Sequence, residues 1–221
     1  MSFSVDSTEH RSVVASRLPR ELRWFLTFYV AILIPTYLVT YGPTNFLYFC
    51  DMALLLTLIA MWRKSALLVS AAAVGIILPQ LLWAVDFMSS LLGVPITGMT
   101  EYMFQSSIPV HVRVLSFFHF WLPFLLIWLL RRTGYDPRGL LLWTVLAFAS
   151  LYICYFFIPA PPAPVNNPNL PVNINYVYGF SDASPQTWMP EVAWFILLQT
   201  MLVFLVLLPS HWALKKIYRA A

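Results

Sequence analysis

The sequence predicts an all-α polytopic membrane protein with six transmembrane helices and both termini in the cytoplasm. Three observations lead to this prediction. Hydrophobic residues make up 60% of the 221 residues and charged residues only 10%, long apolar runs recur along the chain, and basic residues gather beside the ends of alternate runs. A soluble domain has about 45–50% apolar and about 25% charged residues, so the composition excludes that class. The net charge of +4 does not indicate a nucleic-acid partner, because the basic residues mark membrane orientation instead.

Six stretches are long and apolar enough to cross a bilayer core of about 30 Å, which takes roughly 20 residues of helix. Each must be helical, because lipid offers no partner for backbone polar groups. Pro35, Pro79 and Pro123 fall within these stretches and predict kinks. The expected spans are 24–41, 46–62, 66–85, 114–130, 140–158 and 192–208, in a membrane domain 23–209 that follows a cytoplasmic segment 1–22 and precedes a basic cytoplasmic tail 210–221.

The lysine and arginine residues set the expected orientation, since short cytoplasmic loops carry an excess of both. If the six spans alternate, twelve of the 13 basic residues fall on one side and only Arg113 falls on the other. The start of the chain has no apolar core before its charges, so we do not expect a cleavable signal peptide. The twelve residues are Arg11, Arg17, Arg20, Arg23, Arg63, Lys64, Arg131, Arg132, Arg138, Lys215, Lys216 and Arg219.

Ionisable groups within spans are costly and point to function. At 1.5 Å per residue, Cys50 and Asp51 are expected about 6–8 Å below the exoplasmic end of the second span, and His119 about 8 Å below that end of the fourth. Asp86 closes the third span on the same side. These groups therefore reach similar depths from three predicted helices.

One interpretation of this cluster is nucleophilic catalysis. Cys50 would be the nucleophile, His119 its general base, and Asp51 or Asp86 the carboxylate that orients the imidazole. An oxyanion donor would also be needed, for which Asn45 and Asn175 are candidates.

Other interpretations of the same residues stay open. Cys50 could be a small buried apolar residue, His119 could hydrogen-bond a neighbouring helix, and Cys50 could form a disulfide with Cys154 in an oxidising compartment. The four histidines lack metal-ligand spacing, so no metal and no cofactor are expected. The long exoplasmic connections 86–113 and 159–191 could be surface spacers or loops that close over a site.

Several segments resemble the YwaF-type bacterial integral membrane proteins and, more distantly, the eukaryotic transmembrane acyltransferase of ether-phospholipid metabolism. The matching segments are FLYFCDMALLL, PQLLWAVDF, VRVLSFFHFWLPFLLIW and INYVYGFSDASPQTWMPEVAWF, within residues 43 to 208. The resemblance implies a six-helix fold in which Cys50 carries the acyl group and faces His119. This chain departs from the family in the residues that flank Cys50, which are more apolar than usual.

Together these features predict a membrane-embedded acyltransferase or lipid-ester hydrolase. Its partner would be a membrane lipid that enters laterally, and the resemblance places it in the bacterial cytoplasmic membrane. The alternative is a non-enzymatic membrane scaffold or permease-like protein in which Asp51 and His119 pair for packing or proton relay.

Overall fold

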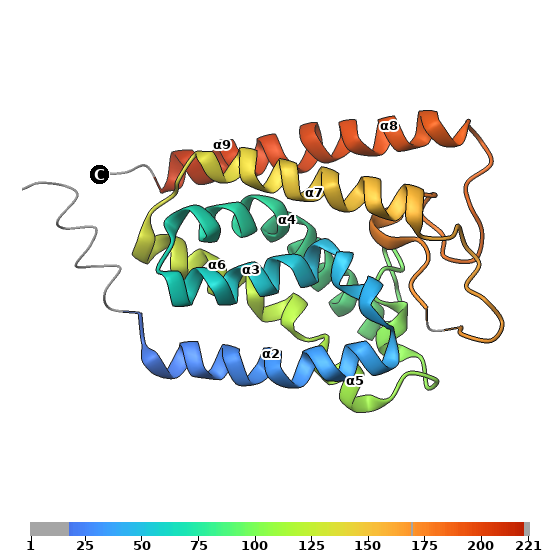
Figure 1. Ribbon diagram of the computed structural model, residues 1–221, viewed down its shortest axis with the longest axis horizontal. Helices are drawn as coiled ribbons and strands as arrows, with labels where there is room; N and C mark the ends of the chain where they lie inside the picture. The colour runs from blue at the N-terminus through green and yellow to red at the C-terminus, as the bar shows by residue number, and fades with distance from the viewer. Residues whose placement is uncertain (1–17, 169, 219–221) are drawn as a thin grey trace, which may run out of the picture.

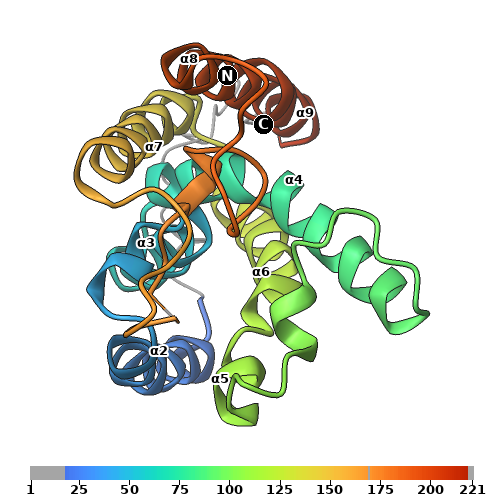
Figure 2. The same ribbon diagram turned by 90° about the vertical axis from the view of Figure 1, so that its right-hand side faces the viewer.

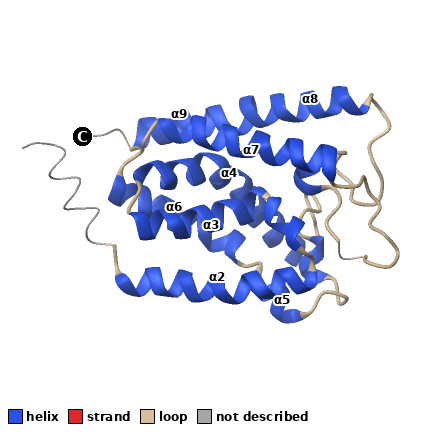
Figure 3. Ribbon diagram, viewed as in Figure 1, coloured by secondary structure: helices blue, strands red, loops and turns tan. Residues whose placement is uncertain are grey.

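A computed structural model describes residues 18–168 and 170–218, and within these residues the chain forms helices and no strand (Figures 1 and 3). The predicted all-α class is therefore confirmed for this part of the chain. The α-helices are α2 (Arg20–Thr40), α3 (Phe49–Arg63), α4 (Ala66–Leu91), α5 (Val110–Leu115), α6 (Phe118–Thr133), α7 (Arg138–Phe157), α8 (Glu191–Met201) and α9 (Leu208–Ile217). Short 3₁₀ turns cover Pro43–Leu47, Glu101–Phe104 and Ile174–Tyr176, and a π-helical segment, Leu202–Leu207, joins α8 to α9.

Five segments of the described chain are long and apolar enough to cross a membrane: Arg20–Thr40, Ala66–Leu91, Val110–Thr133, Arg138–Phe157 and Glu191–Ile217. Each contains most of a predicted span. The last continues about nine residues beyond its predicted end, so most of the predicted basic tail is helical.

The second predicted span, 46–62, does not form one helix of spanning length. Its helix, α3, has 15 residues and begins at Phe49, because Gly42 and Pro43 lead the chain into the Pro43–Leu47 turn first. Gly42 has φ +84°, which only glycine adopts readily. Cys50 and Asp51 consequently lie in the first turn of α3, rather than more than a turn below the start of a longer helix.

The helices run along the long axis of the molecule with alternating direction (Figure 1). The start of α2, the α3–α4 and α6–α7 connections and the end of α9 lie together, at the left of Figure 1, and we call this the basic end. The longer connections 92–109 and 158–190 lie at the opposite end, which we call the loop end (Figure 2). The basic residues in or beside the elements of the basic end are Arg20, Arg23, Arg63, Lys64, Arg131, Arg132, Arg138, Lys215 and Lys216, whereas Arg11, Arg17 and Arg219 lie outside the described residues.

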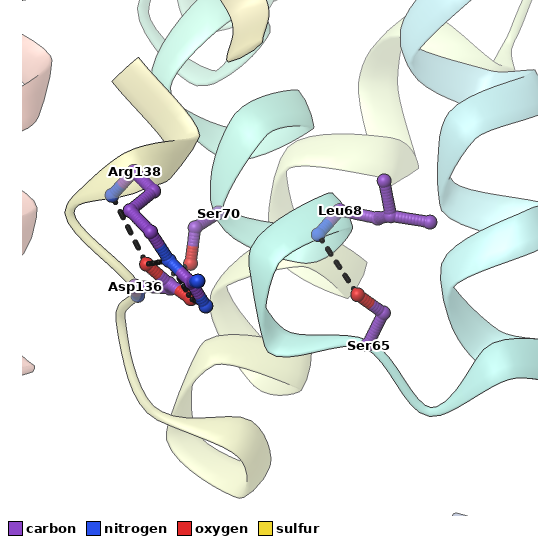
Figure 4. Close-up of polar contacts among 5 residues, drawn as sticks. All are labelled: Ser65, Leu68, Ser70, Asp136 and Arg138. Atoms are coloured by element: carbon purple, nitrogen blue, oxygen red, sulfur yellow. Dashed lines mark hydrogen bonds and ion pairs between the residues drawn. The ribbon is translucent and has the colours of Figure 1, made fainter. Parts of the chain in front are cut away.

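Short polar contacts hold the connections of the basic end (Figure 4). The Ser65 hydroxyl caps α4 by accepting a hydrogen bond from the Leu68 N–H at 3.3 Å, as serines at helix N-cap positions commonly do. The Ser70 hydroxyl accepts from the Asp136 N–H at 2.8 Å, and the Asp136 carboxylate pairs with Arg138 at 2.7 Å. The α6–α7 connection is thereby fixed to the start of α4.

Helix α4 is the most buried of the candidate spans and packs against α3, α6, α7 and α9. Its first half is rich in small residues, with Ser70, Ala71, Ala72 and Ala73 followed by Gly75. Small residues let helix backbones approach closely in membranes. Gly139 of α7 rests directly on this stretch, since a Cβ there would lie 2.7 Å from the Ala71 nitrogen.

The close approach of α7 to α4 gives a first prediction. Gly139→Ala should lower the free energy of unfolding by about 1–3 kcal/mol, because the added methyl group meets backbone that cannot rotate away. Helix propensity alone predicts the opposite sign, a gain of up to about 1 kcal/mol. Thermal unfolding in detergent, followed by tryptophan fluorescence, distinguishes the two.

Gly93→Asn is the matched control. Gly93 follows α4 with φ +79°, and a Cβ there meets nothing within 4 Å. The N–H groups of Gly93 and Val94 bond back to the carbonyls of Ser90 and Ser89, a helix end that asparagine also accepts. A Gly139→Ala protein as stable as wild type would show that α4 and α7 do not pack this closely.

Candidate functional site

Asp51 is a buried carboxylate at the loop end. It occupies the third position of α3, where the helix dipole favours negative charge, and is 2% exposed. The Asn45 amide donates to its Oδ2 at 3.0 Å, which ties the Pro43–Leu47 turn to α3. Its other oxygen, Oδ1, is buried and has no partner among the described residues. One acceptor of this carboxylate is therefore available.

Cys50 precedes Asp51 in the same turn and is half-buried. Both it and Cys154 are free thiols in the structure, so the disulfide alternative is not what the structure contains. Cys154 is fully buried in α7 and lies 3.9 Å from the Ser150 hydroxyl. Cys50 lies in the first turn of α3 at the loop end, and Cys154 lies in the last turn of α7.

His119 lies in the first turn of α6, just after a short break between α5 and α6. Pro123 has no N–H to donate to the His119 carbonyl, so regular helix is weakened there. The ring nitrogen Nδ1 is 2.7 Å from the Ser116 carbonyl oxygen. Because a carbonyl can only accept, the proton resides on Nδ1, which leaves Nε2 as an acceptor.

The ring of His119 is further held by stacking on Trp83 of α4, with ring centroids 5.0 Å apart and planes inclined by 22°. The Ser116 carbonyl and the Trp83 indole therefore orient the His119 imidazole, where the sequence analysis expected a carboxylate. Among the described residues, no hydrogen bond or ion pair joins His119 to Cys50, Asp51 or Asp86.

Asp86 is fully buried near the end of α4, and its carboxylate holds the following loop. Oδ1 accepts from the N–H groups of Ile96, Thr97 and Gly98 at 3.0, 2.6 and 3.3 Å. Oδ2 accepts from the N–H and the hydroxyl of Thr100 at 3.1 and 2.7 Å. With both oxygens engaged in this way, Asp86 acts as a structural anchor of the 96–100 turn, and its role as orienting carboxylate stays a prediction without a contact to support it.

The two candidate oxyanion donors, Asn45 and Asn175, are also engaged. The Asn45 amide donates to Asp51, as above. The Asn175 amide donates to the Leu47 carbonyl at 2.9 Å and to the Ser150 hydroxyl at 3.3 Å, while its oxygen accepts from the Phe49 N–H at 3.1 Å. Asn175, in a left-handed conformation with φ +57°, thus caps α3 from the distant loop.

The second long connection therefore folds into the loop end rather than lying on it as a spacer. Residues 172–175 and 177–178 of this loop are buried against α7, α8 and the Pro43–Leu47 turn. Asn173 holds its shape by donating to the carbonyls of Gly179 and Ser181, and Tyr178 donates to the carbonyls of Tyr155 and Ile158. The loop closes over the N-terminus of α3, where Cys50 lies.

Residues that the sequence analysis did not select complete the cluster. The Tyr37 and Ser116 hydroxyls are 2.8 Å apart and join α2 to the α5–α6 break. The Tyr102 hydroxyl lies near the Ser116 hydroxyl and the Trp83 indole, but neither the Tyr102 hydroxyl nor the Trp83 N–H makes a hydrogen bond in full geometry. A thiolate at Cys50 would raise the pKa of Tyr102, so the two groups lie in the same part of the loop end. In the sequence these are aromatic residues near span ends, which are typical of the interfacial belt, so no signal separated them.

No family model matches the chain, and neither the curated proteins nor the solved structures include a match to it. The residues themselves therefore carry the functional argument.

The anchoring role of Asp86 gives the second prediction. Asp86→Asn places an amide NH₂ against backbone N–H groups, so it should lower stability by about 1.5–3 kcal/mol, the range for a hydrogen bond to a charged group. Limited proteolysis should cut residues 92–109 faster than in wild type. Glu101→Gln, an exposed carboxylate of the same loop, is the control and should behave as wild type.

If the 92–109 loop of Asp86→Asn is cut by protease as slowly as that of wild type, the five hydrogen bonds do not hold the loop in place. If Asp86→Asn lowers the reactivity of Cys50 without faster proteolysis of the loop, Asp86 is the carboxylate that orients His119.

Proposed function

We propose that the chain crosses the membrane six times, with both termini in the cytoplasm. The short helix α3 rises about 22 Å, and the Pro43–Leu47 turn before it continues the crossing segment at the loop end. The alternating direction of the helices and the gathering of basic residues at one end support this topology. The resemblance to YwaF-type proteins supports the bacterial cytoplasmic membrane as its location.

We further propose that the protein is a thiol-dependent acyltransferase or hydrolase that acts on a lipid ester at the loop end. The observation that carries this proposal is a set of buried polar groups at the loop end without well-formed hydrogen bonds, one of which belongs to Asp51, the neighbour of the free thiol Cys50. Unpaired buried polar groups cost about 1–3 kcal/mol each, so their concentration favours a site built for a ligand. They are Thr44 Oγ1, Asp51 Oδ1, Trp83 Nε1 and the Tyr102 hydroxyl.

The proposed roles follow from the atom of each side chain that is not engaged in a hydrogen bond. Cys50 is the nucleophile, because it is a free thiol in the first turn of α3 at the loop end. His119 is the general base, because its Nδ1 is committed to Ser116 and its Nε2 can take a proton. Asp51 contributes its unpaired oxygen, which can accept a hydrogen bond from the substrate or from a water.

The non-enzymatic alternative requires Asp51 and His119 to pair. Asp51 is bonded to Asn45 and His119 to Ser116, and among the described residues no hydrogen bond joins His119 to Asp51 or to Cys50. Neither pairing is made in the structure, so the reactivity experiments below decide between the two interpretations.

The topology gives the third prediction. Reporter fusions after Lys64, Arg138 and Ala221 should report the cytoplasm, and fusions within residues 159–190 should report the opposite side. The fusion after Lys64 is decisive, because it tests whether the short helix α3 crosses. An exoplasmic report there would exclude six spans.

The fourth prediction concerns Cys50. In native membranes without reductant, a permeant alkylating reagent should label Cys50, and Cys50→Ala should remove that label. Cys154→Ala is the matched control, since Cys154 is fully buried in α7, and it should leave the labelling unchanged. His119→Ala should slow labelling at pH 7 at least about tenfold, because the thiol loses its base.

A lipid-ester turnover assay in proteoliposomes separates catalysis from packing. Cys50→Ala and His119→Ala should each abolish turnover. The double variant should lower the turnover rate little further, because the effects of mutating residues of one catalytic unit are strongly non-additive. If His119→Ala lowers only thermal stability, with Cys50 reactivity intact, the enzyme assignment is wrong.

A further inference from the structure

Two hydrogen-bond donors of the loop end lie side by side without a well-formed hydrogen bond. The indole N–H of Trp83 and the hydroxyl of Tyr102 are both buried, and neither meets an acceptor in full hydrogen-bond geometry among the described residues. The Tyr102 hydroxyl lies near the Ser116 hydroxyl and the Trp83 indole, which gives it weak partners at most. Trp83 is only 5% exposed. Native proteins pair nearly all buried donors, so a ligand oxygen that accepts from both would complete their hydrogen bonding.

Both donors are held rigidly. Trp83 is stacked between His119, at 5.0 Å, and Phe87, at 5.3 Å with planes inclined by only 5°. Tyr102 lies in the 3₁₀ turn Glu101–Phe104, which begins right after Thr100, the residue that Asp86 binds twice. Arg113 fixes the same turn by donating from Nη1 to the Met103 carbonyl at 3.0 Å. Donors held in this way lose little freedom when a ligand binds.

The donors lie in the same part of the loop end as the proposed reacting groups. Trp83 carries the face on which His119 stacks. A thiolate at Cys50 would raise the pKa of Tyr102. Burial raises the pKa of Tyr102, so its hydroxyl keeps its proton and remains a donor. Two neutral donors suit a carbonyl oxygen, whose partial negative charge grows to a full charge during nucleophilic attack.

We infer that Trp83 and Tyr102 form the oxyanion site of the enzyme and bind the carbonyl oxygen of an acyl ester. This inference rests on the proposed function and assigns the donors that Asn45 and Asn175 were expected to supply. The Cys50 proton passes to Nε2 of His119 as the sulfur bonds to the carbonyl carbon, and the carbonyl π electrons move to the oxygen. Trp83 N–H and Tyr102 O–H donate to that oxygen. When the C=O bond re-forms, the C–O bond to the alcohol breaks, and His119 returns the proton to the leaving alkoxide.

The test compares two reactions of the same thiol. Alkylation by iodoacetamide displaces iodide at a saturated carbon and forms no oxyanion, whereas acylation by a p-nitrophenyl ester of a medium-chain fatty acid does. Tyr102→Phe and Trp83→Phe each remove a donor and keep an aromatic ring. Each should slow acylation of Cys50 by about 10²–10³-fold more than it slows alkylation. Tyr102→Phe, which does not touch His119, should leave alkylation within about twofold of wild type.

A purely structural role predicts a different pattern. Tyr102→Phe removes a buried hydroxyl that makes no well-formed hydrogen bond, so its Tm should stay close to that of wild type while acylation falls. Trp143→Phe is the matched control, because Trp143 also has a buried, unpaired indole N–H, and it packs against Gly75 and Phe49 instead. It should lower Tm and leave the acylation rate of the folded protein unchanged.

The outcomes separate the two proposals. Acylation of both Phe variants within about threefold of wild type would overturn the oxyanion assignment while leaving Cys50 as nucleophile. A wild-type Cys50 that is alkylated but never acylated would overturn the enzyme assignment and the oxyanion site with it.

Discussion

The position of α4 determines the arrangement of the other helices and of the candidate site. Its first half contains a run of small residues, so α7 can rest on its backbone, with Gly139 over Ala71 and Trp143 over Gly75. In lipid, helices associate through van der Waals packing and not through the hydrophobic effect. The close approach of α7 to α4 is therefore a principal source of stability for the helix bundle. The second half of the same helix carries Trp83 and Asp86 at the loop end. A shift of α4 at the basic end would therefore displace the site as well.

Buried polar groups at the loop end fall into two sets. One set is fully bonded: Asp86 to residues 96–100, Asn173 within its own loop, and Asn175 to the start of α3. These residues fix loops to helices. The other set, including Asp51 Oδ1, Trp83 Nε1 and the Tyr102 hydroxyl, makes no well-formed hydrogen bonds. Since the bonded set holds the unbonded set in place, structural and functional demands on the same small region are met by different side chains.

The helical class followed from composition and the apolar runs, because lipid leaves the backbone no alternative. The start of α3 did not, since the apolar residues Phe46–Tyr48 look helical, and only the Gly42–Pro43 turn sends them into a 3₁₀ turn. Asp86 was predicted by depth alone, but its partners are mainly backbone N–H groups that leave no mark in a sequence. Trp83 and Tyr102 could not be found, because an aromatic residue with an unpaired donor looks the same in sequence as one facing lipid.

The cap that Asn175 places on α3 bears on how the protein is made. The Phe49 N–H receives its partner from a residue 126 positions later in the chain. During synthesis, α3 thus forms with an incomplete first turn, and Cys50 stays uncovered until α7 and the loop after it have emerged from the ribosome. A chain that stops after α7 would contain the thiol and the imidazole but not the loop that closes over them. Maturation of the site is therefore a late event in biogenesis, set by the last third of the polypeptide.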